Sequence, residues 1–147
     1  GYSITVTPPA GALAPQVPLT DADLHVAVVP LADGRMRVAG TAEFAGYDTT
    51  LQPARVANLV GLLRRLYPEM MRAVRDADVI PWTGLRPMCA DGVPLIGATR
   101  VPNLFLNTGH GHLGWTLGAG SGRLAADAVL GRTPPIEAAR YRLARFD

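Results

Sequence analysis

The sequence contains only one cysteine, Cys89, and no long apolar run among its 147 residues. A lone cysteine excludes a disulfide within the chain and any metal site built from several cysteines, and it is typical of proteins from a reducing compartment. No stretch approaches the ~18 consecutive apolar residues that a membrane-spanning helix needs. We therefore expect a soluble, globular, cytoplasmic protein, with association at the inner face of the cytoplasmic membrane as the alternative.

Aromatic residues and net charge are also low. The chain has four tyrosines, three phenylalanines and two tryptophans, and its net charge is +2 with the arginines scattered along it. A nucleic-acid-binding surface needs clustered basic residues and aromatic stacking platforms. We therefore expect no nucleic-acid partner.

Apolar residues at every second position predict strands in the first part of the chain. Residues 2–6 alternate in this way, lack the basic stretch and apolar core of a signal peptide, and look like a strand entered in mid-course. We expect a segment to precede them in the parent protein, and a proline-rich loop over 8–18 to follow them. The runs 25–30 and 36–40 flank Asp33-Gly34 and predict a β-hairpin.

One amphipathic helix is predicted between Thr50 and Pro68. Its apolar residues recur at intervals of three and four, at Val56, Leu59, Val60, Leu63 and Leu66. Thr50 is the expected N-cap, because its hydroxyl can accept a hydrogen bond from a free N–H of the first turn, and Pro53 suits that turn. Pro68 ends the pattern.

Shorter strands and a second helix are predicted in the rest of the chain. Strands are expected over 79–82, 95–97 and 104–107, with turns at glycine and proline residues between them. A glycine-rich turn and a helix that ends at Gly131 follow the last of these strands. We place a soft domain boundary near Pro81. The elements together predict an α/β (α+β) fold.

The glycine-rich segment 107–116 lies where a strand is expected to end and a helix to begin. Backbone N–H groups and the positive end of the helix dipole can bind an anion at such a position. The spacing fits GxGxxG, but no acidic residue follows about 20 positions later in a βαβ unit, so the dinucleotide fingerprint is incomplete. The alternative is a stripe of small residues, Gly114, Gly118 and Gly122, that lets another element pack closely. The residues favour neither interpretation, and the two are compatible.

Arg86 precedes Pro87 in Trp82-Thr-Gly-Leu-Arg-Pro, and a residue before proline is biased towards an extended backbone. A guanidinium binds a carboxylate through two parallel hydrogen bonds and keeps its charge at working pH. Arg86 is therefore a candidate anchor for a carboxylate. Most arginines are exposed without such a role, so an ordinary surface arginine is the alternative.

The other residues of reactive types lack the neighbouring groups that catalysis or metal binding would require. Cys89 has no activating base near it in the sequence and is expected to be inert. His110 and His112 are two positions apart with no third ligand at a fitting spacing, so we expect no metal site. The remaining candidates are expected at the surface or in turns, the carboxylates as unpaired groups and the arginines on a solvated helix face: Glu43, Asp48, Asp91, Arg140, Arg142 and Arg145.

Three sequence blocks together resemble the D-amino-acid dehydrogenases of the D-amino-acid oxidase and glycine oxidase superfamily. The blocks are Trp82-Thr-Gly-Leu-Arg-Pro-Met, Asp91-Gly-Val-Pro-Leu-Ile-Gly and Asn103-Leu-Phe-Leu-Asn-Thr-Gly-His-Gly-His-Leu-Gly-Trp-Thr. The likeness extends more loosely over Gly1-Tyr-Ser, Arg37-Val-Ala-Gly-Thr-Ala-Glu-Phe and Gly131-Arg-Thr-Pro, so it covers nearly the whole chain. The chain is identified as a member of this superfamily.

The resemblance implies a two-domain flavoenzyme of which this chain is the C-terminal portion. Residues 1–80 are then part of the mixed-sheet substrate-binding domain. Residues 81–147 carry the substrate-anchor loop and the C-terminal strand-turn-helix of the FAD-binding domain. The N-terminal segment that would hold the FAD pyrophosphate and ribose is missing, so this chain alone is expected to be inactive. FAD is the implied cofactor of the parent protein, and its presence in this fragment is left open.

The resemblance also implies roles for the two candidate segments. Arg86 would bind the α-carboxylate of a D-amino acid, with His112 as a second substrate-binding candidate. The flavin would lie along Gly109, His110, Gly111, Leu113, Gly114, Trp115 and Thr116. There the helix end would stabilise negative charge at flavin N1 and O2. His25 and Tyr47 are weaker candidates for a second carboxylate contact, and neither is assigned.

The implied reaction is hydride transfer from the substrate Cα to flavin N5, followed by hydrolysis of the imino acid to a 2-oxo acid and ammonia. No acid–base pair is assigned, because the protein has only to dock the carboxylate and orient the Cα–H. An apolar substrate such as D-alanine is expected, with quinone and oxygen both open as electron acceptor. The alternatives are a glycine- or sarcosine-type amine oxidase, and a non-catalytic truncated domain that forms a homo-oligomer.

Overall fold

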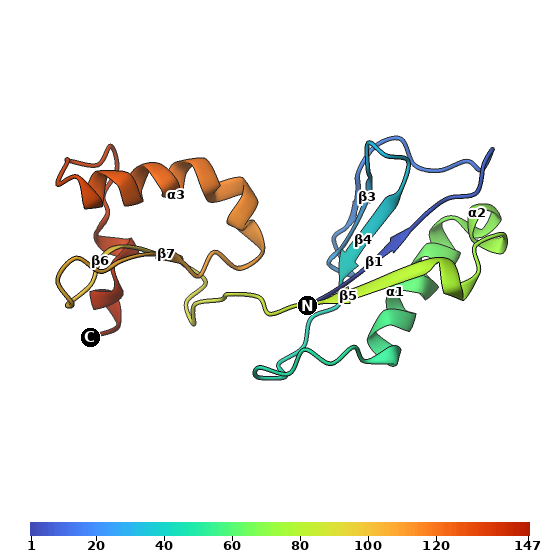
Figure 1. The fold of residues 1–147 in the computed structure, drawn as a ribbon, viewed down its shortest axis with the longest axis horizontal. Coiled ribbons are helices and arrows are strands. Elements are labelled where there is room, and N and C mark those ends of the chain that lie inside the picture. Colours follow the sequence, from blue (N-terminus) through green and yellow to red (C-terminus); the bar gives the residue numbers. More distant parts are fainter. The chain divides into compact units, whose positions relative to one another are not determined.

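The computed structural model describes all residues from Gly1 to Asp147. The chain folds as two compact units, Gly1–Leu85 and Arg86–Asp147 (Figure 1). The division falls slightly after the boundary expected near Pro81, because Pro81 lies within a strand of the first unit and pairs with Ile4. None of the helices has both the length and the apolar character required to cross a membrane.

The first unit is built on a five-stranded sheet with the order β2-β3-β4-β1-β5. The strands are β1 (Tyr2–Val6), β2 (Leu19–Asp21), β3 (Val26–Pro30), β4 (Met36–Gly40) and β5 (Val79–Thr83). The predicted strands are present, and β2 is a short addition that the sequence pattern did not reveal. Every pairing within this chain is antiparallel, so the parallel pairing of a mixed sheet is not formed among these residues.

The predicted hairpin around Asp33-Gly34 is confirmed as β3 and β4. The N–H of Leu31 donates to the Arg35 carbonyl at 2.8 Å, and Asp33 Oδ1 accepts the N–H of Arg35 at 3.1 Å. Gly34 has φ +81°, in the left-handed region that only glycine enters without strain. The turn chemistry therefore fixes the register in which Val28 lies opposite Val38.

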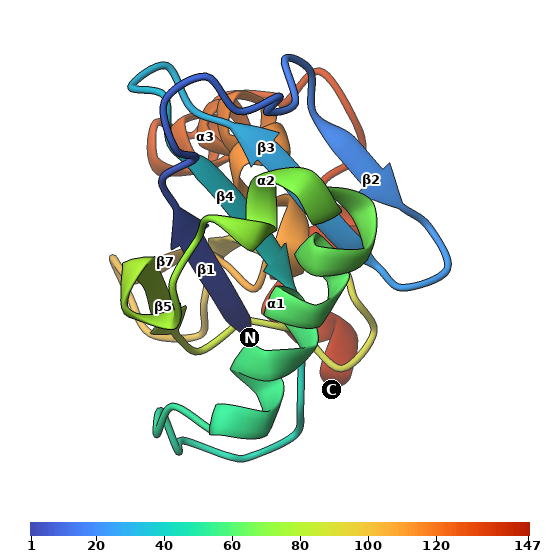
Figure 2. The ribbon, with the colours of Figure 1, turned by 90° about the vertical axis from the view of Figure 1, so that its right-hand side faces the viewer.

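Two helices cover one face of this sheet, α1 (Pro53–Leu66) and α2 (Pro68–Arg72) (Figure 2). They enclose the core of the unit, whose fully buried side chains are Ile4, Val6, Val28, Met36, Val38, Leu59 and Leu63. The expected N-cap was wrong. The N-cap of α1 is Gln52, whose carbonyl accepts the N–H groups of Arg55 and Val56. Thr50 belongs to the preceding turn, where its N–H donates to Asp48 Oδ1 at 2.8 Å.

β1 is buried on both faces, although its alternating sequence is typical of a half-exposed strand. It lies between β4 and β5, and the polar side chains Ser3 and Thr5 are only 3% and 7% exposed. Ser3 Oγ accepts a hydrogen bond from Arg37 Nη2 at 2.8 Å. The guanidinium carbon of Arg37 lies 5.7 Å from the centre of the Trp82 ring. Side chains of the neighbouring strands therefore cover the polar face.

The second unit consists of a hairpin, one long helix and a tail with short helical turns. β6 (Leu95–Ala98) and β7 (Phe105–Thr108) pair antiparallel, and α3 (Gly114–Val129) packs against both strands. The turns are η2 (Gly111–Leu113) before α3, and η3 (Ala139–Tyr141) and η4 (Leu143–Phe146) in the tail. A further turn, η1 (Asp76–Asp78), precedes β5 in the first unit. These bounds confirm the predicted strands and helix to within one or two residues.

Candidate functional site

The loop that begins at Arg86 is joined to the glycine-rich segment by backbone contacts. The N–H of Gly111 donates to the Pro87 carbonyl at 2.9 Å, and Met88 and His110 form an antiparallel bridge. These contacts bring together two segments that are far apart in the sequence. Arg86 therefore leaves the backbone next to the turn that begins α3.

Glycine is required in this turn. Gly109 and Gly111 have φ +78° and +58°, in the left-handed region that other residues rarely enter. A Cβ on Gly109 would also lie 2.3 Å from Cys89 Sγ, which no real contact allows. The Cys89 side chain thus packs against the turn.

The first turn of α3 has free backbone N–H groups. The helix begins at Gly114, its N-cap residue is Leu113, and no side chain caps it. An uncapped helix of this length carries partial positive charge at its N-terminus and offers N–H donors to an anion or an electronegative ring edge. Residues of the predicted flavin segment therefore fit a group with developing negative charge at this position.

The alternative role, a stripe of Gly114, Gly118 and Gly122, finds little support within the second unit, where a Cβ on Gly114 would meet only His110 Cβ, at 3.5 Å. A Cβ placed on Gly118, Gly120 or Gly122 would meet nothing within 4 Å, and the Trp115 side chain is 99% exposed. This face of α3 is therefore open within the second unit. It offers room beside the helix end.

Arg86 is exposed and forms no ion pair with a carboxylate of this chain. Its guanidinium is thus available to an external anion. His112 is also exposed and lies in η2, directly before α3. The Nε2 atom of His110 is buried with no hydrogen-bond partner. No third histidine, cysteine or carboxylate joins these two histidines in a group that could hold a metal ion.

The two residues considered for a second carboxylate contact lie in the first unit. His25 is exposed and has φ +53° in the turn between β2 and β3. The Tyr47 side chain is 93% exposed. Neither residue has a hydrogen bond that fixes its side chain, so neither gains support as a binding residue.

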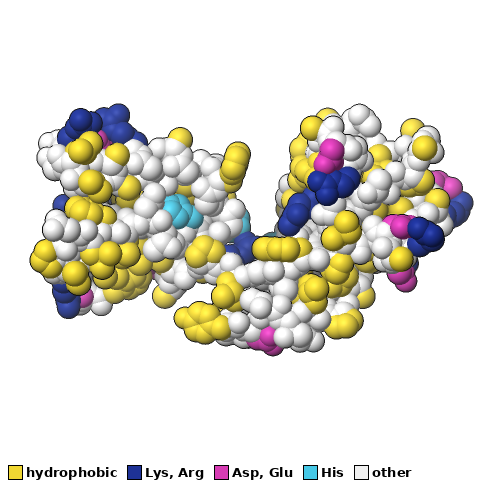
Figure 3. Space-filling model, in the orientation of Figure 1, with side chains coloured by type: hydrophobic (Ala, Val, Ile, Leu, Met, Phe, Trp, Pro, Cys, Tyr) yellow, Lys and Arg dark blue, Asp and Glu magenta, His cyan; other side chains and the backbone are white.

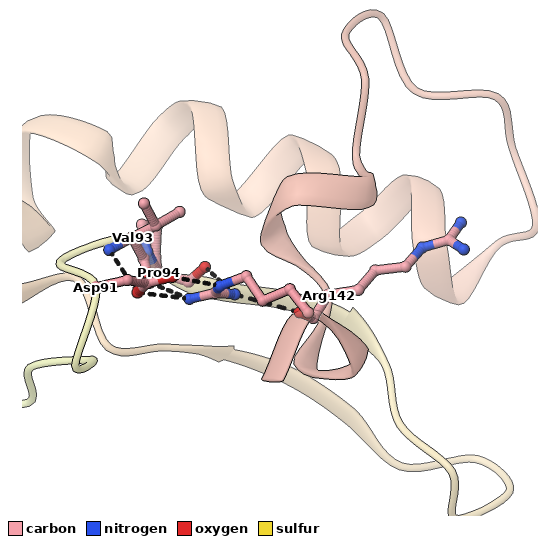
Figure 4. Close-up of polar contacts among 5 residues, drawn as sticks. Asp91, Val93, Pro94 and Arg142 are labelled. Carbon is pink, nitrogen blue, oxygen red and sulfur yellow. Dashed lines mark hydrogen bonds and ion pairs between the residues drawn. The ribbon is translucent and has the colours of Figure 1, made fainter. Parts of the chain in front are cut away.

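Asp91 is not an unpaired carboxylate, which corrects the expectation for this turn. Its two oxygens accept hydrogen bonds from Arg145 Nε at 2.6 Å and Nη2 at 3.0 Å (Figure 4). These contacts lower the pKa of Asp91 to about 2 and raise the pKa of Arg145. Arg145 is only 14% exposed, so it does not lie on a solvated helix face as expected, whereas Arg140 and Arg142 are exposed.

Glu43 and Asp48 are also engaged, contrary to the expectation of lone carboxylates. Glu43 accepts hydrogen bonds from the Tyr2 hydroxyl and from Arg55 Nε. The Tyr2 hydroxyl and then Arg55 lower the pKa of Glu43, and the pKa of Tyr2 rises in response. Hydrogen bonding to Asp48 by the Thr50 side chain, and then by the Thr50 N–H, lowers the pKa of Asp48. These groups hold the loop after β4.

Charged side chains on the face drawn in Figure 3 lie in small separate groups. Apolar and uncharged atoms fill the areas between them, and histidine side chains reach the surface of the second unit.

The sequence belongs to a known family. The model of the FAD dependent oxidoreductase family (DAO) matches residues 1–128, so the chain is a member of that family and the resemblance seen in the sequence is confirmed.

Among curated proteins it is similar to the D-amino acid dehydrogenase of Paramagnetospirillum magneticum, with 48% identity, and to that of Rhizorhabdus wittichii, with 47%. Each match covers 99% of this chain but 34% of the relative. The chain thus spans about a third of the length of these proteins.

Solved structures show the same fold. Glycine oxidase from Geobacillus kaustophilus matches with a TM-score of 0.83 and 26% identity, over 99% of this chain and 38% of that chain. Iminodiacetate oxidase from Chelativorans sp. matches with a TM-score of 0.81 at 20% identity, over 96% of this chain and 38% of that chain. The predicted fold class, a part of an FAD-dependent oxidoreductase with α/β (α+β) structure, is confirmed.

Proposed function

We propose that this chain is the C-terminal portion of an FAD-dependent D-amino-acid dehydrogenase that converts D-amino acids to 2-oxo acids and ammonia. Residues 1–80 would contribute to the substrate-binding domain, and 81–147 would carry the substrate-anchor loop and the end of the FAD-binding domain. The observation that carries the proposal is the hydrogen bond from Gly111 to Pro87, because it joins the Arg86 loop to the uncapped start of α3. A carboxylate anchor and a site for negative charge would thus lie on two adjoining segments.

Arg86 would bind the substrate carboxylate. It has no acidic partner in the chain, and a guanidinium matches a carboxylate through two parallel hydrogen bonds. Docking the carboxylate sets the position of the Cα–H, and this orientation is the main demand that the reaction makes on the protein. His112, exposed in η2, is the second candidate for contact with the substrate.

The residues from Gly109 to Thr116 would form one wall of the cofactor site. FAD, when bound, accepts the hydride from the substrate Cα. The N–H groups of Gly114, Trp115 and Thr116 at the start of α3 would stabilise the negative charge that develops during reduction. The flat, exposed side chain of Trp115 and the open face at Gly118 leave space for a large planar group.

A glycine- or sarcosine-type amine oxidase is the second candidate. The match to a glycine oxidase structure at 26% identity supports it, and the curated relatives at 45% to 48% identity are named D-amino acid dehydrogenases. The two functions differ in the substrate and in whether oxygen or a quinone reoxidises the flavin. Because the higher identities are to dehydrogenases, we favour that function.

The first test is anaerobic flavin reduction by the full-length protein. Purified protein with a visible flavin spectrum is mixed with D-alanine, L-alanine, glycine or sarcosine, and bleaching of the flavin absorbance is followed. We expect reduction by D-alanine, no reduction by L-alanine, and reoxidation by a quinone faster than by oxygen. Faster reduction by glycine or sarcosine, with rapid oxygen consumption, would identify the amine oxidase instead.

The isolated 147-residue chain provides the control. We expect it to show no flavin absorbance and no activity. The segment proposed to bind the FAD pyrophosphate would lie in the part of the full-length protein that this chain does not include. A sedimentation measurement on the same sample tests the third alternative. A homo-oligomer without flavin, combined with an inactive full-length protein, would support a non-catalytic domain.

A further inference from the structure

Arg145 uses all the N–H donors of its guanidinium. Nε and Nη2 donate to the two carboxylate oxygens of Asp91, and Nη2 also donates to the Val93 carbonyl at 2.5 Å. Nη1 donates to the carbonyls of Pro94 and Arg142 at 3.3 and 3.2 Å. Because no donor is left free, the side chain can take only one orientation. Figure 4 shows these contacts converging on the segment before β6.

Arg145 thus acts as a clamp on residues 91–94, and this clamped segment is continuous with the candidate site. The N–H of Gly92, next to Asp91, donates to the Cys89 carbonyl at 3.0 Å. Cys89 Sγ in turn lies against Gly109 in the glycine-rich turn. Short-range contacts therefore lead from Arg145 through the Asp91 turn to both loops of the site.

The contact is long-range in sequence, since 54 residues separate Arg145 from Asp91. The contact joins the two ends of the second unit, because Arg145 lies in η4 near the end of that unit and Asp91 lies near its beginning. Arg145 also lies beyond residue 128, where the match to the family model ends. The family match therefore does not account for it.

We propose that Arg145 is a positioning residue, which fixes the loop carrying Arg86 and the glycine-rich turn through its contacts with Asp91, Val93 and Pro94. The proposal rests on the proposed function, in which Arg86 binds the substrate carboxylate. Arg86 itself has no ion pair and is exposed, so the position of its side chain depends on the backbone of its loop. Loss of the clamp would let that backbone move.

The expected effect falls on substrate binding. A contact with the substrate carboxylate is present both before and during the reaction, so weakening it raises KM more than it lowers kcat. A displacement of about 1 Å in a positioned group reduces catalytic efficiency by about 100-fold. We expect Arg145→Ala to lower kcat/KM for D-alanine by roughly 10- to 100-fold, with the larger part of the change in a raised KM.

The matched control is Arg142→Ala in the full-length, FAD-loaded protein. Arg142 lies in the same tail, its side chain extends away from the clamp, and the variant keeps its carbonyl as an acceptor (Figure 4). The KM of Arg142→Ala for D-alanine should equal that of the wild type. Arg145→Lys should not restore KM, because an ammonium cannot form the two parallel bonds to Asp91. Free guanidinium ion at low millimolar concentration should lower the KM of Arg145→Ala and leave that of Arg142→Ala unaffected.

A purely structural role would give a different result. KM is measured on the flavin-loaded fraction, so it does not depend on how much protein folds. If Arg145→Ala lowers the thermal midpoint while its KM equals that of Arg142→Ala, the proposal is overturned.

If Arg145→Ala does not load flavin, Asp91→Asn is measured in its place. It should raise KM because it removes the charge and one of the two acceptor oxygens, and an unchanged KM overturns the proposal.

Binding of benzoate separates this proposal from the proposed function. Its dissociation constant is read from the change in flavin absorbance and requires no turnover. If no amino acid reduces the wild-type flavin, the proposed function fails, and benzoate binding decides the role of Arg145. Weaker binding to Arg145→Ala than to Arg142→Ala supports positioning, and equal binding overturns it. If the wild type binds neither benzoate nor substrate, both proposals fail.

Discussion

The thiol of Cys89 fills the space beside Gly109 where any other residue would place its Cβ, at 2.3 Å from Sγ. Gly109 also has φ +78°. Two independent requirements, space and backbone conformation, thus fall on one glycine at the centre of the candidate site. They can be separated by mutation.

Gly109→Ala should lower the free energy of unfolding by about 2–5 kcal/mol. A left-handed conformation costs a non-glycine residue roughly 1–2 kcal/mol, and overpacking adds about 1–3 kcal/mol. Cys89→Ala in the same protein should recover the overpacking part and leave the conformational part. Denaturant unfolding of both variants measures the two contributions.

Gly61→Ala is the control for that comparison. Gly61 lies within α1 and a Cβ there would meet nothing within 4 Å, so alanine should stabilise the helix by roughly 0.5–1 kcal/mol. Equal losses at Gly61 and Gly109 would contradict the explanation given for Gly109. Full recovery in the double variant would mean that the backbone conformation costs nothing.

Arg86→Ala should reduce kcat/KM for D-alanine by about 100- to 1,000-fold, because truncating one partner of a desolvated charge pair costs roughly 2–5 kcal/mol. Arg86→Lys should recover only a small part, since lysine cannot bind a carboxylate through two parallel bonds. Steady-state kinetics measure both, with the flavin spectrum as a check on folding. Arg140→Ala, at another exposed arginine of the same unit, should behave like the wild type. Full activity of Arg86→Ala would remove it from the site.

The sequence predicted the local elements better than the contacts between them. The hairpin at Asp33-Gly34 follows from turn chemistry, and α1 follows from the spacing of its apolar residues. The burial of Ser3 does not follow from its polar character, because it depends on β1 having a strand on each side. Local spacing indicated a solvated face for Arg145, and no local pattern can encode its contact with Asp91, 54 residues away.

The same reasoning applies to the candidate site. Arg86 and the glycine-rich turn could be singled out by residue type and by family resemblance. Their connection could not, since it depends on backbone contacts, the hydrogen bond from Gly111 to Pro87 and the bridge between Met88 and His110. Backbone hydrogen bonds leave no signature in residue identity outside regular elements. The fit of Cys89 against Gly109 was missed for a related reason, because a thiol at a packing contact resembles any other small apolar residue.

Asp91 should make stability depend on pH in the acid range. The pKa of its carboxyl is about 2 in the folded protein, below the ordinary value of 3.8, because Arg145 binds the charged form. A lowered pKa stabilises the folded state above the unfolded value, and this stabilisation is lost as the pH falls from about 4 to about 2. Asp91→Asn should therefore show a shallower loss of stability over that range. Unfolding curves at several pH values test this, and parallel pH dependence of the two proteins would contradict it.

Asp127 is a buried carboxylate whose only hydrogen-bond donor is Arg123. Asp127 is 1% exposed, its Oδ2 accepts from Arg123 Nε at 2.8 Å, and its Oδ1 has no partner. Arg123→Ala should lower the free energy of unfolding by about 1–3 kcal/mol, because it leaves a buried charged group without a donor. The value is below that of a fully buried ion pair, since the Arg123 side chain is 64% exposed.

Arg72→Ala provides the comparison, because Arg72 pairs with Glu69 and both side chains are at least 73% exposed. That change should cost no more than about 0.5 kcal/mol. Asp127→Asn added to Arg123→Ala should recover part of the loss, because an unpaired amide is less costly to bury than an unpaired carboxylate. Denaturant unfolding of the four proteins gives each value. A loss for Arg123→Ala no larger than that for Arg72→Ala would mean that another donor reaches Asp127 in the full-length protein.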